Sequence, residues 1–218
     1  MTPKAILFDL DGTLVDTAPD LANATNRLRE HHGLPPLPFA TIRREVSNGG
    51  SALVTLALGL EASAPEHVSA RQWWLGAYEQ AVATHSCIFP PLDKWLHQWE
   101  MLKRPWGIVT NKPRRYTEPL LQALTLYPGA LLCADDLAVK KPAPEPLWEA
   151  ARQLGVAPED CWYVGDHLRD MEAAKAANMH AVAVGYGYIA EQDDYRTWPA
   201  DIWFADCAEL VSALPKPS

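Results

Sequence analysis

The chain has 218 residues and a mass of 24.1 kDa, which is enough for one full domain with a smaller insertion. Its net charge is −8 and its basic residues are scattered, which argues against nucleic acid or an anionic membrane as a general partner. The four cysteines form no CxxC pair, which favours reduced thiols over disulfides or a zinc site. With no recognisable signal peptide and no apolar run of membrane length, we expect a cytoplasmic protein.

The first predicted element is a short apolar run, Ala5 to Phe8, that leads directly into two acids. Its length is typical of a buried parallel strand, and ligands bind at the carboxyl end of such strands. Asp9 and Asp11 stand at that end, where two like charges require a cation or a proton to balance them. Gly12 then allows a sharp turn close to a ligand. An ordinary Asp-Gly turn is the alternative for this motif taken alone.

The segment from about residue 16 to residue 86 has helical patterns and no strand pattern. Pro19 and Gly33 bracket a first helix, with Pro19 near its start and Gly33 just beyond its end. Further helical patterns lie at 41–46, 51–58 and 68–81. We therefore expect a helical insertion after the first strand, with residues 1–15 and 87–218 forming the core and residues 16–86 forming a small helical domain.

Strands and helices alternate in the remainder of the chain. Apolar side chains recur at helical spacing from Leu92 to Leu102, which predicts a helix facing a core. We expect further helices around 120–124, 145–154, 171–177 and 208–214, and strands at 107–109, 130–133, 162–164, 181–184 and 201–204. This alternation predicts an α/β fold with a doubly wound parallel sheet covered on both faces.

Polar residues follow several of these strands and add to the two acids of the first. Thr110 follows the second core strand, Lys141 precedes the helix at 145–154, and Asp166 and Asp170 follow the strand at 162–164. Taken singly, these residues have ordinary alternatives: a helix cap at Thr110, a solvated lysine at Lys141, and N-capping of a helix by Asp166. Together they place acids, a lysine and a hydroxyl at one edge of the sheet, where such an oxygen-rich set suits Mg²⁺ rather than zinc.

This constellation resembles the haloacid dehalogenase superfamily. The motifs are DxDGT at 9–13, the Thr110 strand end, Lys141, and GDxxxD at 165–170, in that order. The stretch LVDTAPDLANATNRL is similar to the phosphoglycolate phosphatase subfamily, whose helical cap lies where we expect the insertion. VSNGGSALV, VTNKPRRYTEPLL and GYGYI are most similar to bacterial N-acetylmuramic acid 6-phosphate phosphatases. The resemblance implies a Mg²⁺-dependent phosphomonoesterase that acts on 2-phosphoglycolate or N-acetylmuramic acid 6-phosphate.

The resemblance also implies a role for each motif residue. Asp9 is the nucleophile that becomes an aspartyl-phosphate, and Asp11 protonates the leaving alkoxide and then activates water. Thr110 and Lys141, with the backbone at Asn111, hold the phosphoryl oxygens. The implied metal ligands are the carboxylates of Asp9 and Asp166 and the carbonyl of Asp11, with Asp170 binding the metal or its waters.

The cap is expected to recognise the leaving group. Arg43 or Arg44 would pair with a substrate carboxylate, and the turn at Asn48 and Gly49 would present an amide and backbone N–H groups. The alternative is that this turn only caps the helix that follows. Small residues such as Gly50 leave room at the turn, which favours the larger amino-sugar phosphate.

Three other functions stay open at this point. A dehalogenase of the same superfamily has no use for an acid at Asp11, which argues against that activity. A sugar phosphomutase keeps both acids but must hold its phosphoenzyme for a second substrate. A non-enzymatic phosphate-binding protein on the same scaffold would be expected to lose Asp9, Asp11 or Lys141, and all three are present. The sequence leaves the oligomeric state open.

Overall fold

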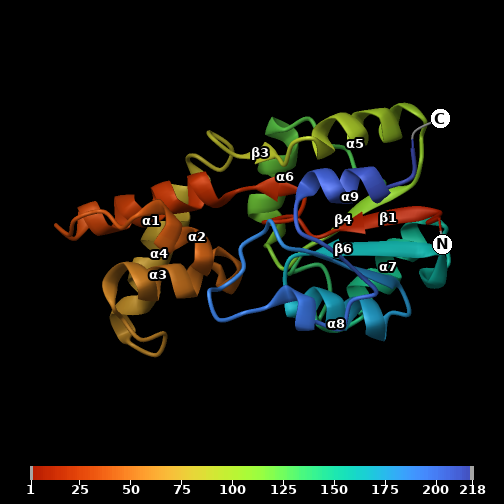
Figure 1. The fold of residues 1–218 in the computed structure, drawn as a ribbon. Coiled ribbons are helices and arrows are strands. Elements are labelled where there is room, and N and C mark those ends of the chain that lie inside the picture. The colour runs from red at the N-terminus through yellow and green to blue at the C-terminus, as the bar shows by residue number, and fades with distance from the viewer. Residues whose placement is uncertain (1, 217–218) are drawn as a thin grey trace.

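The computed structural model describes residues 2–216 and shows a central sheet with helices on both faces (Figure 1). The six-stranded sheet has the order β5-β4-β1-β6-β7-β8, and all of its neighbouring strands are parallel. Its strands are β1 (Ala5–Phe8), β4 (Trp106–Val109), β5 (Ala130–Leu132), β6 (Cys161–Gly165), β7 (His180–Val184) and β8 (Ile202–Phe204). The prediction of a doubly wound parallel sheet is confirmed.

Helices cover the two faces of the sheet in separate layers. On one face lie α5 (Leu92–Met101), α6 (Arg114–Ala123) and α9 (Cys207–Ala213), and on the other lie α7 (Glu145–Leu154) and α8 (Leu168–Ala176). The alternation of side chains along β1 supplies both layers, because Ile6 and Phe8 belong to the first cluster whereas Ala5 and Leu7 belong to the second.

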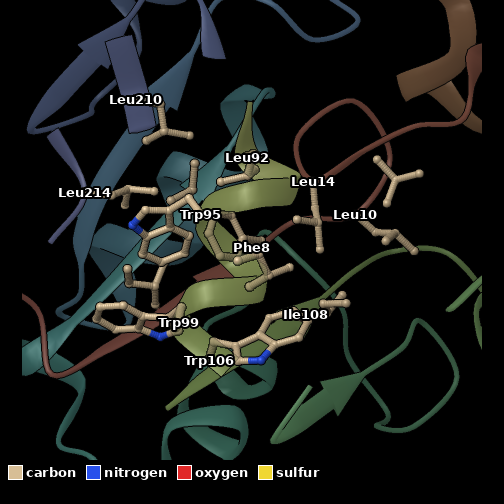
Figure 2. Close-up of a cluster of buried hydrophobic side chains, with 14 of the residues drawn as sticks. Phe8, Leu10, Leu14, Leu92, Trp95, Trp99, Trp106, Ile108, Leu210 and Leu214 are labelled. Atoms are coloured by element: carbon tan, nitrogen blue, oxygen red, sulfur yellow. The ribbon is translucent and has the colours of Figure 1, made fainter. Parts of the chain in front are cut away.

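The first of these clusters contains several large aromatic side chains (Figure 2). Trp95 and Trp99 of α5 stack with their ring centroids 4.8 Å apart, and Phe8 and Ile108 from adjacent strands belong to the same cluster. All four side chains are buried. Burying a side chain of this kind contributes about 1.5–3 kcal/mol. This packing fixes β1, the strand that Asp9 follows.

A bundle of four helices lies at one end of the sheet, opposite the end that carries the two chain termini (Figure 1). We call these helices, α1 (Ala18–His31), α2 (Phe39–Glu45), α3 (Gly49–Leu58) and α4 (Pro65–Glu79), the helix bundle. They share their own buried cluster, in which the Trp74 indole N–H donates to Thr25 Oγ1 at 3.1 Å. A single 3₁₀ turn, η1 (Val46–Asn48), separates α2 from α3.

Two short antiparallel strands join the helix bundle to the rest of the molecule. They are β2 (Val15–Asp16) and β3 (Cys87–Ile88), and the sequence patterns did not predict them. Two residues are too few for a recognisable alternation. Beside this ribbon the buried carboxylate of Asp20 accepts hydrogen bonds from the backbone N–H groups of His85 and Ser86 and from the Ser86 hydroxyl, so α1 is tied to the returning chain.

Two further expectations concern the chain as a whole. Within residues 2–216, none of the helices combines the length and apolar character needed to cross a membrane. Cys87, Cys133, Cys161 and Cys207 are free thiols, as expected from their spacing.

Candidate active site

The carboxyl ends of three neighbouring strands bring the predicted site residues together. β1 lies between β4 and β6, with Phe8 opposite Ile108 on one side and Val164 on the other. Asp9 follows β1, Thr110 follows β4, and Asp166 follows β6. Because the strands are parallel and in close register, their polar successors meet at one edge of the sheet.

Three buried carboxylates form an acid cluster at this edge. Asp9, Asp166 and Asp170 each offer one oxygen, and these oxygens all lie within 4.8 Å of one another. The three residues are 6%, 1% and 0% exposed, so water provides little screening. Asp166 is oriented at both oxygens, because Thr13 Oγ1 donates to Oδ1 at 3.1 Å and Tyr188 N–H donates to Oδ2 at 2.8 Å.

Lys141 is the cation in contact with the acid cluster among the described residues. Its Nζ lies 2.9 Å from Asp9 Oδ1 and 2.7 Å from Asp170 Oδ1, and the side chain is almost fully buried. The same Nζ donates to the hydroxyl of Tyr163 at 2.7 Å, and that hydroxyl donates to the Val109 carbonyl at 2.8 Å. The lysine is therefore held from two directions.

One lysine does not balance three buried carboxylates. Burial, followed by the charges of Asp9 and Asp170, raises the pKa of Asp166 to about 7. Burial also raises the pKa of Asp9, although Lys141 opposes the rise. The anionic cluster thus needs further positive charge, and its donors are all carboxylate oxygens. This donor set fits a hard divalent cation.

Asp11 faces a second, separate group of side chains. Thr17 Oγ1 donates to its Oδ1 at 2.6 Å, and Lys112 Nζ lies 3.0 Å from the same oxygen. Burial is the largest single influence and lowers the pKa of Lys112, but the charges and hydrogen bonds of Asp11 and Tyr78 together outweigh it, so the net pKa is above the ordinary value. The ammonium also lies 4.8 Å from the ring centroid of Tyr78 on α4. The carboxylate of Asp11 is thereby held apart from the acid cluster.

A cavity of about 380 Å³ opens between this edge of the sheet and the helix bundle. Asp9, Asp11, Thr110 and Lys112 line it from the sheet side. The opposite side combines apolar and aromatic side chains with polar groups around the start of α3 and with the guanidinium of Arg71 on α4. The residues are Leu21, Val46, Ser47, Asn48, Gly49, Gly50, Ser51, Leu53, Arg71, Trp74, Leu75 and Tyr78. A cavity of this size is in the range that holds an organic ligand.

The predicted substrate-binding residues divide into two groups. Asn48, Gly49 and Asn111 line the cavity. Arg44 does not line it and instead pairs with Glu191 at the surface. Arg43 does not line it either, because its guanidinium donates to backbone carbonyls of residues 186 and 187.

Two details of the predicted site have a different physical basis in the structure. The residue that caps α8 is His167, whose Nδ1 accepts from Arg169 N–H, while Asp170 Oδ2 accepts from the His167 N–H. Asp166 is therefore not the cap considered from the sequence. Gly50 does not leave open room, because a Cβ there would lie 2.6 Å from the Trp74 ring.

Sequence reasoning missed several residues that complete the site. Lys112, Tyr163 and Tyr188 contact Asp11, Lys141 and Asp166, respectively. Arg71 and Arg169 are the guanidinium groups that line the cavity. For Lys112 a signal existed, since it follows Thr110 and Asn111 in the same loop. Tyr163 lies within a strand and reads as ordinary core.

The fold and the acid cluster define a class of hydrolase. The model of the haloacid dehalogenase-like hydrolases matches residues 3–178, and the chain belongs to this family. It is 40% identical over 218 residues to an N-acetylmuramic acid 6-phosphate phosphatase of Pseudomonas aeruginosa, covering 99% of this chain and 96% of the relative. It is 39% identical over 220 residues to a phosphoglycolate phosphatase of Xanthomonas campestris pv. campestris, covering 99% of each.

A solved structure shares the whole architecture. The crystal structure of a predicted phosphoglycolate phosphatase from Haemophilus somnus 129PT has a TM-score of 0.82 and 26% sequence identity, and covers 97% of this chain and 98% of its own. The helix bundle, the sheet and the edge that carries the acid cluster are therefore features of a known fold.

Proposed function

We propose that this chain is a Mg²⁺-dependent phosphomonoester hydrolase that works through an aspartyl-phosphate on Asp9. The observation that carries the proposal is the position of Asp9, which lines the cavity and also belongs to the acid cluster beside Lys141. A nucleophile at this point reaches a substrate on one side and positive charge on the other.

In the first half-reaction, Asp9 attacks phosphorus and the ester oxygen leaves. Oδ1 of Asp9 accepts a hydrogen bond from Leu10 N–H at 2.7 Å and lies 2.9 Å from Lys141 Nζ. The other oxygen of this carboxylate, Oδ2, has no hydrogen bond among the described residues. Asp11 lines the same cavity and donates a proton to the leaving oxygen. Thr110 and the Asn111 N–H hold phosphoryl oxygens beside the lysine.

In the second half-reaction, Asp11 takes a proton from water as the water oxygen attacks the phosphorus of the acyl phosphate. The bond between phosphorus and the Asp9 oxygen breaks, so inorganic phosphate leaves and the Asp9 carboxylate is regenerated. Thr17 and Lys112 hold the Asp11 carboxylate at its own side of the cavity, so it is available for both steps. The helix bundle covers the phosphoenzyme and limits its access to bulk water.

The metal site would consist of Asp9, Asp166 and Asp170, with the Asp11 carbonyl as the further oxygen ligand that the family motif implies. When bound there, Mg²⁺ supplies the positive charge that offsets repulsion between a carboxylate and a phosphate dianion. Asp170 also contacts Lys141 at 2.7 Å, and it would bind the metal either directly or through one of the metal's waters.

We further propose that residues 16–86 act as a cap on a core of residues 1–15 and 87–218. The cavity supports this division, because side chains of both parts line it. Asn48 and Gly49 would contact the leaving group. Arg71 and Arg169, which line the cavity, would pair with a substrate carboxylate in place of Arg43 and Arg44.

The size and lining of the cavity favour N-acetylmuramic acid 6-phosphate over 2-phosphoglycolate. A cavity of about 380 Å³ with Trp74 and Tyr78 in its wall suits a sugar ring, whereas 2-phosphoglycolate would leave much of it to water. One of the two relatives described above is named for N-acetylmuramic acid 6-phosphate and the other for phosphoglycolate. A phosphomutase is disfavoured, because no carboxylate or imidazole lines the cavity from the described helices of the bundle.

The test is a phosphate-release assay on purified protein in the presence of Mg²⁺ or of a chelator. The substrates are N-acetylmuramic acid 6-phosphate, 2-phosphoglycolate and p-nitrophenyl phosphate. We expect hydrolysis of all three to require the metal. We also expect kcat/KM for the amino-sugar phosphate to exceed that for 2-phosphoglycolate by at least about tenfold, or about 1.4 kcal/mol. Arg71→Met should lower kcat/KM for the amino-sugar phosphate and leave kcat/KM for p-nitrophenyl phosphate unchanged. Full activity without metal would refute the proposal, and a preference for 2-phosphoglycolate would refute only the choice of substrate.

A further inference from the structure

Residues 185–189, which we call the strap, follow β7 and pass beside the acid cluster. The Tyr188 N–H donates to Asp166 Oδ2 at 2.8 Å, and the Tyr186 hydroxyl donates to the Thr13 carbonyl at 2.8 Å. A Cβ on Gly187 would lie 2.2 Å from the same Asp166 oxygen. The strap therefore limits where this carboxylate can lie.

The strap also contacts the first helix of the bundle. The phenol oxygen of Tyr188 accepts hydrogen bonds from the N–H groups of Thr17 and Ala18 at 2.6 and 2.8 Å, and its hydroxyl donates to Asp16 Oδ1 at 2.8 Å. Thr17 makes no side-chain cap of its own for α1. Tyr188 thus supplies the acceptor that unpaired amides at a helix start require.

Arg43 connects the strap to a second helix of the bundle, α2. Its two terminal nitrogens donate to the carbonyls of Gly187 and Tyr186 at 2.8 and 2.9 Å. Its guanidinium also lies 4.9 Å from the ring centroid of Tyr188. Hydrogen bonds from a charged donor are stronger than neutral ones, so this is a firm attachment of α2 to the strap.

We propose that Arg43 is a positioning residue that couples the seating of the helix bundle to the carboxylate of Asp166. Arg43 donates to the carbonyls of residues 186 and 187, and the N–H of Tyr188, the next residue along the chain, donates to the Asp166 carboxylate. Movement of α2 away from the core therefore either breaks the Arg43 bonds or draws the strap away from Asp166. The inference rests on the proposed role of Asp166 as a metal ligand.

Coupling of this kind is reciprocal. If the seated bundle favours metal binding, then metal binding favours the seated bundle by the same factor. A residue that only attached the bundle to the core would change thermal stability and would leave metal affinity alone. The two roles are therefore separable by experiment.

The variant that tests the coupling is Arg43→Met, with Arg29→Met as its matched control. Arg29 also donates to two backbone carbonyls, those of Pro35 and Ala57, but both acceptors lie within residues 16–86 and neither belongs to the strap. We would titrate each protein with Mn²⁺, follow free Mn²⁺ by electron paramagnetic resonance, and measure kcat for p-nitrophenyl phosphate, which needs no recognition by the cap.

We expect Arg43→Met to weaken Mn²⁺ binding about fivefold or more, in the range of ordinary coupling between sites, and to lower kcat. Arg29→Met should match the wild-type protein in both measurements even where its melting temperature falls. In hydrogen exchange, Mn²⁺ should slow the amides of Thr17 and Ala18 in the wild-type protein and do so less in Arg43→Met.

The opposite outcomes are equally specific. If wild-type protein binds Mn²⁺ and hydrolyses the aryl phosphate while Arg43→Met equals Arg29→Met in Mn²⁺ affinity and kcat, the coupling is overturned and the proposed function stands. If wild-type protein does neither, the proposed function fails, and the coupling that depends on it fails as well.

Discussion

Gly187→Ala tests whether the position of Asp166 controls the reaction. An added Cβ would lie 2.2 Å from Asp166 Oδ2, whereas Cβ contacts below 3.0 Å are essentially never observed. The difference requires a shift of at least about 0.8 Å by the carboxylate or the strap. Misplacement of a site group by about 1 Å costs on the order of 10²-fold in rate, or about 2.7 kcal/mol. We therefore expect kcat for p-nitrophenyl phosphate to fall by about that factor.

The control for this variant is Gly76→Ala in α4. A Cβ there meets nothing within 4 Å, and replacing glycine inside a helix stabilises it by about 0.5–1 kcal/mol. Gly76→Ala should therefore keep wild-type kinetics and melt slightly higher. Steady-state kinetics and thermal melts of both variants, with circular dichroism to verify folding, complete the assay. A well-folded Gly187→Ala protein with wild-type kcat would refute the reasoning about Asp166.

Two further predictions concern the proposed proton-transfer role of Asp11 and the contribution of the Asp136–Arg114 pair to stability. Asp11→Asn should release one equivalent of p-nitrophenol in a burst and then turn over at least about 10²-fold more slowly, because this leaving group needs no proton from Asp11, whereas the attacking water must lose a proton to it. Stopped-flow absorbance at about 400 nm would show the burst, and an unchanged steady state would count against Asp11. The hydrogen bond from Arg114 outweighs partial burial and lowers the pKa of Asp136. The pair therefore stabilises the fold at pH values above the ordinary aspartate pKa of about 3.9. This stabilisation is lost as pH falls through the lower pKa of the folded state. Asp136→Asn should cost under about 1 kcal/mol at pH 7, and this cost should shrink as pH falls below the ordinary aspartate pKa, which thermal melts across pH would establish.

Much of the architecture follows from local sequence patterns. The apolar runs that end at Asp9, Thr110 and Asp166 predict parallel strands, and parallel strands bring their carboxyl ends to one edge. That is why residues more than 150 positions apart along the chain could be expected in one site. Spacing also indicated the helices of the bundle, since a periodicity of 3.6 residues is visible without knowledge of any partner.

Contacts between distant side chains could not be predicted in the same way. The Tyr188 hydroxyl and the Thr17 N–H are 171 residues apart, and nothing in either segment specifies the other. Arg43 and Arg44 are adjacent and chemically equal in the sequence, yet one binds the strap and the other pairs with Glu191. Only the seating of α2 against the core distinguishes them. Gly50 illustrates the same limit, because the absence of a side chain there makes room for the ring of Trp74 rather than for a ligand.

The measurement that tests the central claim most directly is the identification of the phosphorylated residue. Asp11→Asn protein would be quenched in acid during turnover of p-nitrophenyl phosphate with Mg²⁺, reduced with borohydride to convert an acyl phosphate to an alcohol, and digested for peptide mass spectrometry. We predict that the modified residue is Asp9 and that an Asp9→Asn variant yields neither the modified peptide nor product. Modification at any other residue, or turnover by Asp9→Asn at even a tenth of the wild-type rate, would contradict an aspartyl-phosphate on Asp9.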